Sequence, residues 1–137
     1  MDCIFCKIIS GEIPSSKVYE DEDFIAILDI RPVNLGHTLV IPKRHFVNIF
    51  DTDEEIAQKI YPVLIKVCKG IKDGLTADGI NIIQNNEKYA GQEVFHSHIH
   101  IIPRFRDDGL KFTPRSLTYK DEDEKNRIVL KIREKIK

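Results

Sequence analysis

Three histidines occupy alternate positions near the end of the chain, in the segment GQEVFHSHIHIIPR, residues 91–104. Side chains two residues apart on a β-strand point to the same face, so we expect His96, His98 and His100 to form a column. Imidazoles serve as metal ligands, nucleophiles and proton carriers near neutral pH. Crowding and desolvation oppose three imidazoles on one face, so the column indicates a functional site rather than an ordinary exposed strand.

A second chemical signal is the C-x-x-C spacing of Cys3 and Cys6. This spacing occurs in tetrahedral zinc sites, where two further nitrogen or sulfur ligands complete the shell, and in redox-active dithiols. The sequence lacks the βαβ pattern that usually accompanies the redox motif, which favours metal over redox chemistry. Two reduced thiols without a metal remain the alternative. Cys68 lies in a helical pattern and is interpreted as a small buried apolar residue.

Length and charge limit the classes of protein that could present these groups. With 137 residues the chain is long enough for one domain with a sizeable core, and we expect a single domain over 1–137. A formal net charge of −1 argues against a nucleic-acid binder, zinc-dependent or otherwise. No apolar run approaches membrane-spanning length and no signal-peptide pattern opens the chain. The expectation is a soluble cytoplasmic protein.

The elements that must position these residues follow from the hydrophobic periodicity. The pattern predicts an α+β fold, with an antiparallel sheet of about five strands, one long helix and a C-terminal helix. Strands are expected within 16–30 (two), 37–42, 79–86 and 94–103, and helices within 3–14, 51–71 and 120–137. In the strand that carries the column, Phe95, Ile99 and Ile101 should face the core. His37 and His45 flank the strand at 37–42, so all five histidines converge if it pairs with the column.

The column with Gly-Gln before it, together with LDIRPVNLGHTLVIPKRH at 28–45, resembles the histidine triad (HIT) family of nucleotide hydrolases and transferases, most closely its prokaryotic-type branch. The resemblance covers nearly the whole chain. It implies that His98 attacks the α-phosphate, and that water then releases a nucleoside monophosphate from the nucleotidyl-histidine. It also implies that a backbone carbonyl sets the tautomer of His98, while His37 and His100 orient the site and balance charge. Amides of Asn85 and Gln92 would approach the phosphate or the scissile oxygen.

The same resemblance implies a purine nucleotide site around these groups. Asp29 would accept hydrogen bonds from the ribose hydroxyls, and backbone N–H groups near Gly91 would approach the phosphate. An apolar clamp would hold the base, formed by Phe5, Ile8, Phe24, Leu28 and Ile30. Glu93 departs from the small hydroxyl residue common in the eukaryotic branches, so its backbone rather than its side chain is expected to serve the phosphate. Val94 completes the predicted nucleotide site.

For the metal, the resemblance implies a closed structural zinc site formed by Cys3, Cys6, His45 and His96. It further implies a homodimer in which two sheets join edge to edge. Three functions stay open on these grounds. The substrate could be a nucleoside phosphoramidate or another adenylylated small molecule, or it could be a dinucleoside polyphosphate. The chain could also be a zinc-stabilised nucleotide-binding module with little turnover.

Overall fold

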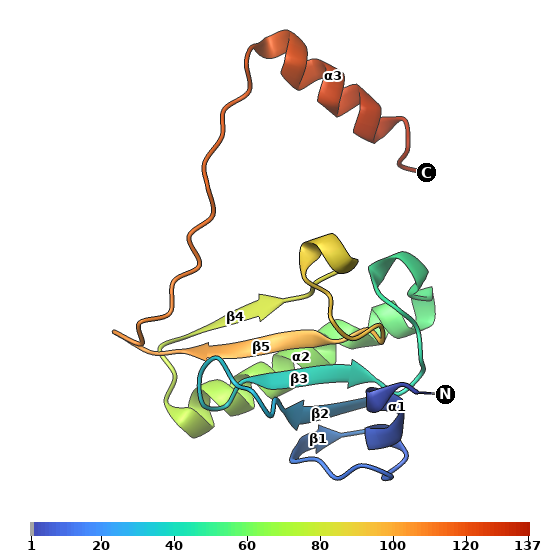
Figure 1. The fold of residues 1–137 in the computed structure, drawn as a ribbon, viewed down its shortest axis with the longest axis vertical. Helices are drawn as coiled ribbons and strands as arrows, with labels where there is room; N and C mark the ends of the chain where they lie inside the picture. Colours follow the sequence, from blue (N-terminus) through green and yellow to red (C-terminus); the bar gives the residue numbers. More distant parts are fainter. Residues whose placement is uncertain (1) are drawn as a thin grey trace.

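The architecture is a five-stranded antiparallel sheet with strand order β1-β2-β3-β5-β4 (Figure 1). It is seen in a computed structural model that describes residues 2–137. The strands are β1 (Lys17–Glu20), β2 (Phe24–Leu28), β3 (Thr38–Pro42), β4 (Gly79–Ile83) and β5 (Ile99–Arg104). The helices are α1 (Ile4–Ile9), α2 (Glu54–Leu75) and α3 (Glu122–Arg133), with short 3-10 turns at Ile49–Asp51 and Lys88–Ala90. The predicted α+β class is confirmed.

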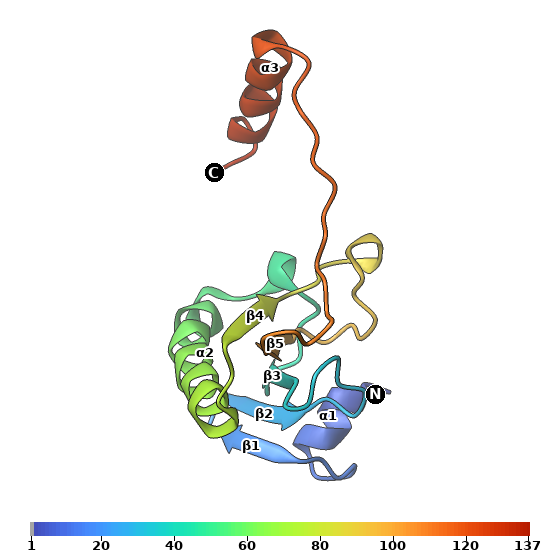
Figure 2. The ribbon, with the colours of Figure 1, turned by 90° about the vertical axis from the view of Figure 1, so that its left-hand side faces the viewer.

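Helix α2 covers one face of the sheet (Figure 2). Its start is set by Asp53, whose side chain accepts a hydrogen bond from the backbone N–H of Ile56 and so satisfies a free helical donor. Its end is set by Thr76, which adopts a left-handed conformation. Pro62 lies inside the helix, which continues on both sides of it. The residues that the helix buries are Ile56, Val63, Leu64, Val67 and Ile71.

Both faces of the central strands are buried, and their alternation defines two separate clusters. Phe24 and Ala26 of β2 belong to the cluster packed under α2. Ile25 and Ile27 belong to the cluster on the α1 side. Because side chains alternate along a strand, the parity of a position decides which layer it enters. The functional groups described below lie on the α1 side.

The histidine-bearing segment forms less strand than the sequence pattern predicts. Strand β5 begins at Ile99. Residues 94–96 form a bend, and the Ser97 N–H that follows donates to the Phe46 carbonyl. Phe95 is 48% exposed, so its predicted place in the core is wrong, whereas Ile99 and Ile101 are buried as expected. The bend takes Phe95 out of the alternation that would have directed it inward.

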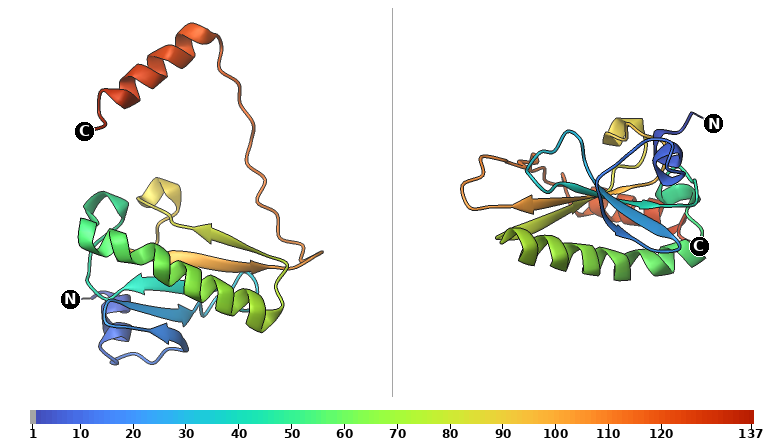
Figure 3. Two further views of the ribbon diagram at one scale, coloured as in Figure 1. Left: turned by 180° about the vertical axis from the view of Figure 1, so that it is seen from behind. Right: turned by 90° about the horizontal axis from the view of Figure 1, so that it is seen from below.

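The C-terminal region departs from the packed body. Residues 111–137 run from the sheet as an extended segment that ends in α3, which stands apart from the remaining elements (Figures 1 and 3). Among residues 2–137, none of the helices is long and apolar enough to cross a membrane.

Candidate functional site

His98 lies at the centre of the site with only one of its ring nitrogens committed to the protein. Its Nδ1 donates a hydrogen bond of 2.8 Å to the backbone carbonyl of His96. The neutral ring therefore carries its proton on Nδ1 and leaves the Nε2 lone pair free. Burial lowers the pKa of His98 below its ordinary value, which keeps the ring neutral at pH 7. A neutral imidazole with a free nitrogen in a pocket is a competent nucleophile.

His37 and His100 form a directed hydrogen-bond chain beside this nucleophile. The backbone N–H of Val33 donates to Nδ1 of His37, so the His37 proton resides on Nε2. His37 Nε2 then donates to Nδ1 of His100 over 2.9 Å. His100 consequently carries its own proton on Nε2. Burial, reinforced by His98 and His37, lowers the pKa of His100 to about 4. His100 is therefore a neutral N–H donor that can bind an anionic oxygen.

A pocket of about 590 Å³ opens in front of His98 and His100. Asp29 stands at its wall, with Oδ2 3.6 Å from Nε2 of His37, while Oδ1 accepts the backbone N–H of Arg31. The pocket brings together the predicted residues Phe5, Ile8, Leu28, Asp29, Ile30, Asn85, Gly91, Glu93, Val94, His98 and His100. It also has lining residues that the sequence reasoning missed, namely Ile4, Ile27, Arg31 and Leu39. The result is an apolar cleft that ends in imidazoles and a carboxylate.

Phe24 does not belong to this pocket, and its prediction as part of a base clamp is wrong. It is buried in the cluster under α2, on the opposite face of the sheet. The alternation of side chains along β2 could have predicted which residues face the pocket. Ile27 is two residues from Asp29 and shares its face, whereas Phe24 is five residues away and points to the other side.

The structure also contradicts the predicted role of the Gln92 side chain at the phosphate. This side chain is buried and makes four hydrogen bonds within the protein, because Nε2 donates to the carbonyls of Val47 and Val94 while Oε1 accepts from Asn48 and the N–H of Glu87. An amide with all its groups engaged cannot also reach a phosphate. Gln92 instead ties the pocket loop to the segment after β3.

The side chain of Asn85 is placed differently from that of Gln92. Asn85 lines the pocket, where its Nδ2 makes only a long contact of 3.5 Å to the Gly91 carbonyl. This amide is therefore available to a ligand.

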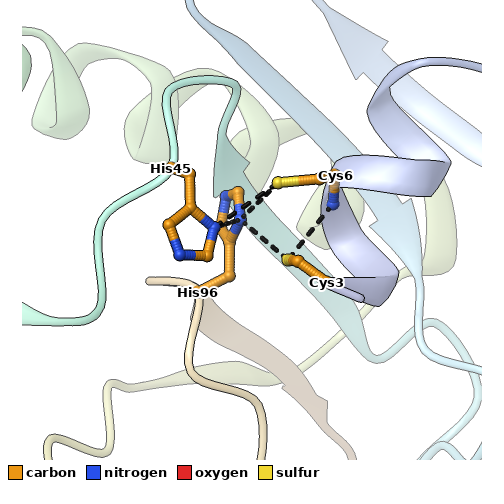
Figure 4. Close-up of side chains that lie close together, drawn as sticks. All are labelled: Cys3, Cys6, His45 and His96. Carbon is orange, nitrogen blue, oxygen red and sulfur yellow. Dashed lines mark hydrogen bonds between the residues drawn. The ribbon is translucent and has the colours of Figure 1, made fainter. Parts of the chain in front are cut away.

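A second cluster is formed by Cys3, Cys6, His45 and His96 (Figure 4). All four ligand atoms lie within 4.8 Å of one another. Sγ of Cys3 is 3.3 Å from Nδ1 of His96, Sγ of Cys6 is 3.4 Å from Nδ1 of His45, and the two Nδ1 atoms are 3.0 Å apart. A tetrahedral zinc ion with usual bond lengths separates its ligand atoms by about 3.3 to 3.8 Å. The cluster thus fits a Cys2His2 metal site.

The tautomer of His96 supports the same conclusion. Its Nε2 donates a 2.8 Å hydrogen bond to the carbonyl of Pro42, which leaves the Nδ1 lone pair facing the cysteines. Burial lowers the pKa of His96 and raises the pKa of the Cys6 thiol. A bound cation would favour both the neutral imidazole and the thiolate.

Comparison with known proteins agrees with the geometry. The sequence model of the HIT domain matches residues 10–107, most of the chain. The chain belongs to the HIT domain family. The match begins after Cys3 and Cys6 and ends before α3, so neither the cysteine pair nor the C-terminal helix is part of the matched HIT region.

Individual HIT relatives extend this match. The chain is 47% identical over 128 residues to Protein hit of Bacillus subtilis, covering 91% of this chain and 88% of that protein. It is 41% identical over 109 residues to Adenylylsulfatase HINT3 of Arabidopsis thaliana, covering 80% of this chain and 55% of that protein. The match to Protein hit supports the same family membership, whereas the chain spans about half the length of HINT3.

Solved HIT structures give the same result. A crystal structure of a HIT family member from Bacillus subtilis aligns with TM-score 0.93 and 44% identity over 100% of this chain and 99% of that one. One from Bacillus anthracis aligns with TM-score 0.89 and 43% identity over 99% and 98%. A zinc-bound histidine triad protein from Mycobacterium smegmatis aligns with TM-score 0.77 and 44% identity over 94% and 91%.

Proposed function

We propose that this protein is a nucleotide hydrolase or transferase that cleaves the α-phosphate of purine nucleotides through a covalent nucleotidyl-histidine. The observation that carries the proposal is the state of His98. Its Nδ1 is tied to the His96 carbonyl, its pKa is lowered, and its second nitrogen is free at the pocket. Structural roles rarely leave one imidazole nitrogen of a buried histidine exposed to a cleft beside two other histidines.

The proposed reaction has two displacements at phosphorus. In the first, the Nε2 lone pair of His98 forms a P–N bond while the bond to the leaving group breaks, and the leaving group departs with the electron pair and acquires a proton. In the second, water adds its hydroxyl to phosphorus, the P–N bond breaks, and its electron pair returns to Nε2. A nucleoside monophosphate and a proton are released. The Nδ1–H bond to the His96 carbonyl supports the positive charge that the ring carries in between.

The neighbouring groups would stabilise the charge on the transferred phosphate. The Nε2–H of His100, fixed by the hydrogen-bond chain from His37, is directed to act on a phosphate oxygen. Asn85 offers a second donor from the pocket wall. Asp29 would accept hydrogen bonds from the ribose, and the apolar clamp of Phe5, Ile8 and Leu28 would hold the base.

The leaving group is proposed to be a small one, as in a nucleoside phosphoramidate or another adenylylated compound. Support comes from the relative HINT3, whose name describes an adenylylsulfatase, an activity that acts on an adenylyl group joined to a small anion. Dinucleoside polyphosphate hydrolysis is the alternative. A nucleotide-binding module with little turnover is a further alternative, which the free nitrogen of His98 argues against.

We also propose that Cys3, Cys6, His45 and His96 hold a structural zinc ion. Four protein ligands at these separations leave no open position for a substrate or water. When bound, the metal would cross-link the α1 segment to the loop after β3 and to the loop before β5. The zinc-bound HIT structure from Mycobacterium smegmatis supports the choice of metal.

Single-turnover kinetics with adenosine phosphoramidate test the proposed activity. Mixing excess enzyme with substrate, quenching in mild base and resolving the products by mass spectrometry should show adenylylated protein that decays to AMP, with the added mass on the peptide that contains His98. A protein that binds AMP but releases no product in a single turnover would leave only the binding-module alternative. A parallel panel of adenylylsulfate and diadenosine polyphosphates ranks the leaving groups.

A further inference from the structure

The C-terminal arm, residues 111–137, contacts the body near its start, where the Arg104 guanidinium lies 5.4 Å from the Phe112 ring, and its helix α3 stands apart. Its residues are exposed except Glu124, which is half-buried. Even so, α3 and the turn after it carry large apolar side chains that are 37% to 70% exposed, namely Ile128, Val129, Leu130, Ile132 and Ile136. An isolated helix of this length is only marginally stable in water. Helix α3 therefore requires a surface that its own body does not provide in this arrangement.

The arm leaves the body in a fixed direction. The carboxylate of Asp108 accepts hydrogen bonds from Asn34, from the guanidinium of Arg104, and from the backbone N–H groups of Phe105 and Leu110. This network holds the turn from which the arm starts. The arm then passes the β4 side of the sheet, away from β1 at the opposite edge (Figure 1).

The placement of the arm is shared with crystal structures. The HIT proteins from Bacillus subtilis and Bacillus anthracis align over 100% and 99% of this chain with TM-scores of 0.93 and 0.89. The arm makes up about a fifth of the residues, so scores this high over the whole chain require the arm to lie in a similar place in those proteins. A helix that was free in solution would have no reason to recur in one position.

A groove of matching character lies between β1 and α2. Its volume is about 550 Å³, and its lining is mostly apolar and includes Val18, Leu28, Leu35, Val67 and Leu75. Gly70 and Gly74 lie on the α2 side, and a Cβ atom built at either position would meet nothing within 4 Å. Another chain can therefore approach this stretch of α2 closely.

We propose that α3 of one copy docks in the groove between β1 and α2 of a second copy, and that the exchange is reciprocal. The arm departs over β4, the edge farthest from its own groove, so a copy placed beyond β4 is the one that it meets. An extended linker of eleven residues, 111–121, spans at most about 36 Å. A five-stranded sheet is about 20 Å wide. The linker is long enough to cross a neighbouring sheet to its far edge.

Charge supports the same pairing. Lys66 lines the groove, and the first turn of α3 carries the carboxylates of Glu122, Asp123 and Glu124. A reciprocal exchange of this kind forms a closed two-fold assembly, because each copy supplies one helix and one groove. The docking proposal does not rest on the proposed catalytic activity.

Hydrogen exchange of α3 measured by mass spectrometry tests the docking. In the intact protein at micromolar concentration, α3 amides should exchange at least about tenfold more slowly than in a peptide of residues 115–137. The variant Gly70→Glu, which places a carboxylate in the groove without a clash in its own fold, should lose this protection. The variant Ile128→Glu/Ile132→Glu should lose it as well. The controls Ala57→Glu on α2 and Asn126→Glu on α3 should retain it.

Mixing the two disabled variants identifies the copy that supplies the groove. The Gly70→Glu copy has an intact arm, and the Ile128→Glu/Ile132→Glu copy has an intact groove. Their α3 peptides differ in mass, so each is followed separately in a 1:1 mixture. Exchange between copies predicts that protection returns to the α3 of the Gly70→Glu copy. Absent protection in the unmodified protein, protection that survives Gly70→Glu, or no recovery on mixing would each overturn the proposal.

Discussion

His96 and His98 stand two residues apart and have the same side chain, yet the protein connects them to two different sites. His96 donates from Nε2 to the Pro42 carbonyl and turns Nδ1 toward two thiols and His45. His98 donates from Nδ1 to the His96 carbonyl and turns Nε2 toward the pocket. The choice of nitrogen that each backbone carbonyl captures thus separates a metal-binding imidazole from a nucleophilic one.

The two clusters also differ in their companions. The cluster of Cys3, Cys6, His45 and His96 contains thiols that become strong soft ligands when deprotonated. The group of Asp29, His37, His98 and His100 contains one carboxylate and no thiol. His37 and His100 are joined by a hydrogen bond, and His98 bonds instead to the His96 carbonyl. The cysteine-containing cluster is therefore suited to a metal ion, and the group with the carboxylate is suited to a polar substrate. His96 joins them, because its side chain serves one cluster and its carbonyl the other.

The largest effect should come from removing the nucleophile. In His98→Asn, we expect AMP release from adenosine phosphoramidate to fall by on the order of 10⁴-fold, because no other group at the pocket supplies a comparable free nitrogen. Zinc content and the free energy of unfolding should change little. Steady-state kinetics and metal analysis on the same sample measure both. Activity within tenfold of that of the unmodified protein would contradict the assignment of His98 as the nucleophile.

The converse variant is Cys3→Ser/Cys6→Ser. It should abolish zinc binding and lower the free energy of unfolding by about 4 kcal/mol when free zinc is 1,000 times its dissociation constant. Urea unfolding with and without a chelator measures the difference, which should vanish in the variant. Turnover per folded molecule should stay within about tenfold. If turnover instead collapsed as in His98→Asn while the fold survived, the metal cluster would have a direct part in catalysis.

Acidification should destabilise the protein through the half-buried His100 of the nucleotide pocket. The pKa of His100 is about 4 when folded and about 6.5 when unfolded, so below pH 6.5 the unfolded chain binds the extra proton. Stability contributed by neutral His100 is complete above pH 6.5 and is lost as the pH falls toward 4. The loss between pH 7 and pH 5 should reach up to about 2 kcal/mol.

The matched measurement uses the Cys3→Ser/Cys6→Ser background, which removes the pH dependence of metal binding. Urea unfolding at pH 7, 6 and 5 should show a shallower decline when His100→Gln is added. Identical declines with and without His100 would mean that this ring is protonated as easily in the folded protein as in the unfolded chain.

Much of this molecule could be predicted from local patterns. The long helix follows from the acidic cap at Asp53 and the apolar stripe after it, and the sheet follows from alternating apolar runs. The four members of the metal cluster, now brought together, come from α1, the loop after β3 and the loop before β5 (Figure 4). The residue types and the family resemblance were enough to predict these four residues, because few side chains can bind zinc.

The errors share a physical cause. The family resemblance places Phe24 in the base clamp, and strand alternation places Phe95 in the core. Their actual places depend on which face of a doubly buried strand they occupy and on where that strand begins. The resemblance directs the amide of Gln92 to the phosphate, but a buried amide first satisfies nearby backbone groups. None of these outcomes is encoded by residue type alone. The detached position of α3 was also inaccessible, because an amphipathic pattern predicts an apolar partner without saying which copy supplies it.

The smallest effect is expected at Asp29, the carboxylate in the wall of the nucleotide pocket. Asp29→Asn keeps the Oδ1 acceptor that holds the Arg31 N–H but removes the negative charge. If the carboxylate accepts from a ribose hydroxyl, KM should rise about tenfold with little change in kcat, since a charged hydrogen bond exceeds a neutral one by roughly 1 kcal/mol or more.

A double-mutant cycle shows whether this loss belongs to the ribose. The same variant is measured with the 2′-deoxy and the 3′-deoxy forms of the substrate, which lack one partner each. The penalty for Asp29→Asn should shrink toward zero with the analogue whose missing hydroxyl normally contacts Asp29. A penalty that stays constant across all three substrates would assign Asp29 to the electrostatics of His37, which lies 3.6 Å away, and not to substrate binding. The pocket would then depend on its imidazoles and apolar walls alone for affinity, and the contrast with the metal cluster would rest on the histidine tautomers.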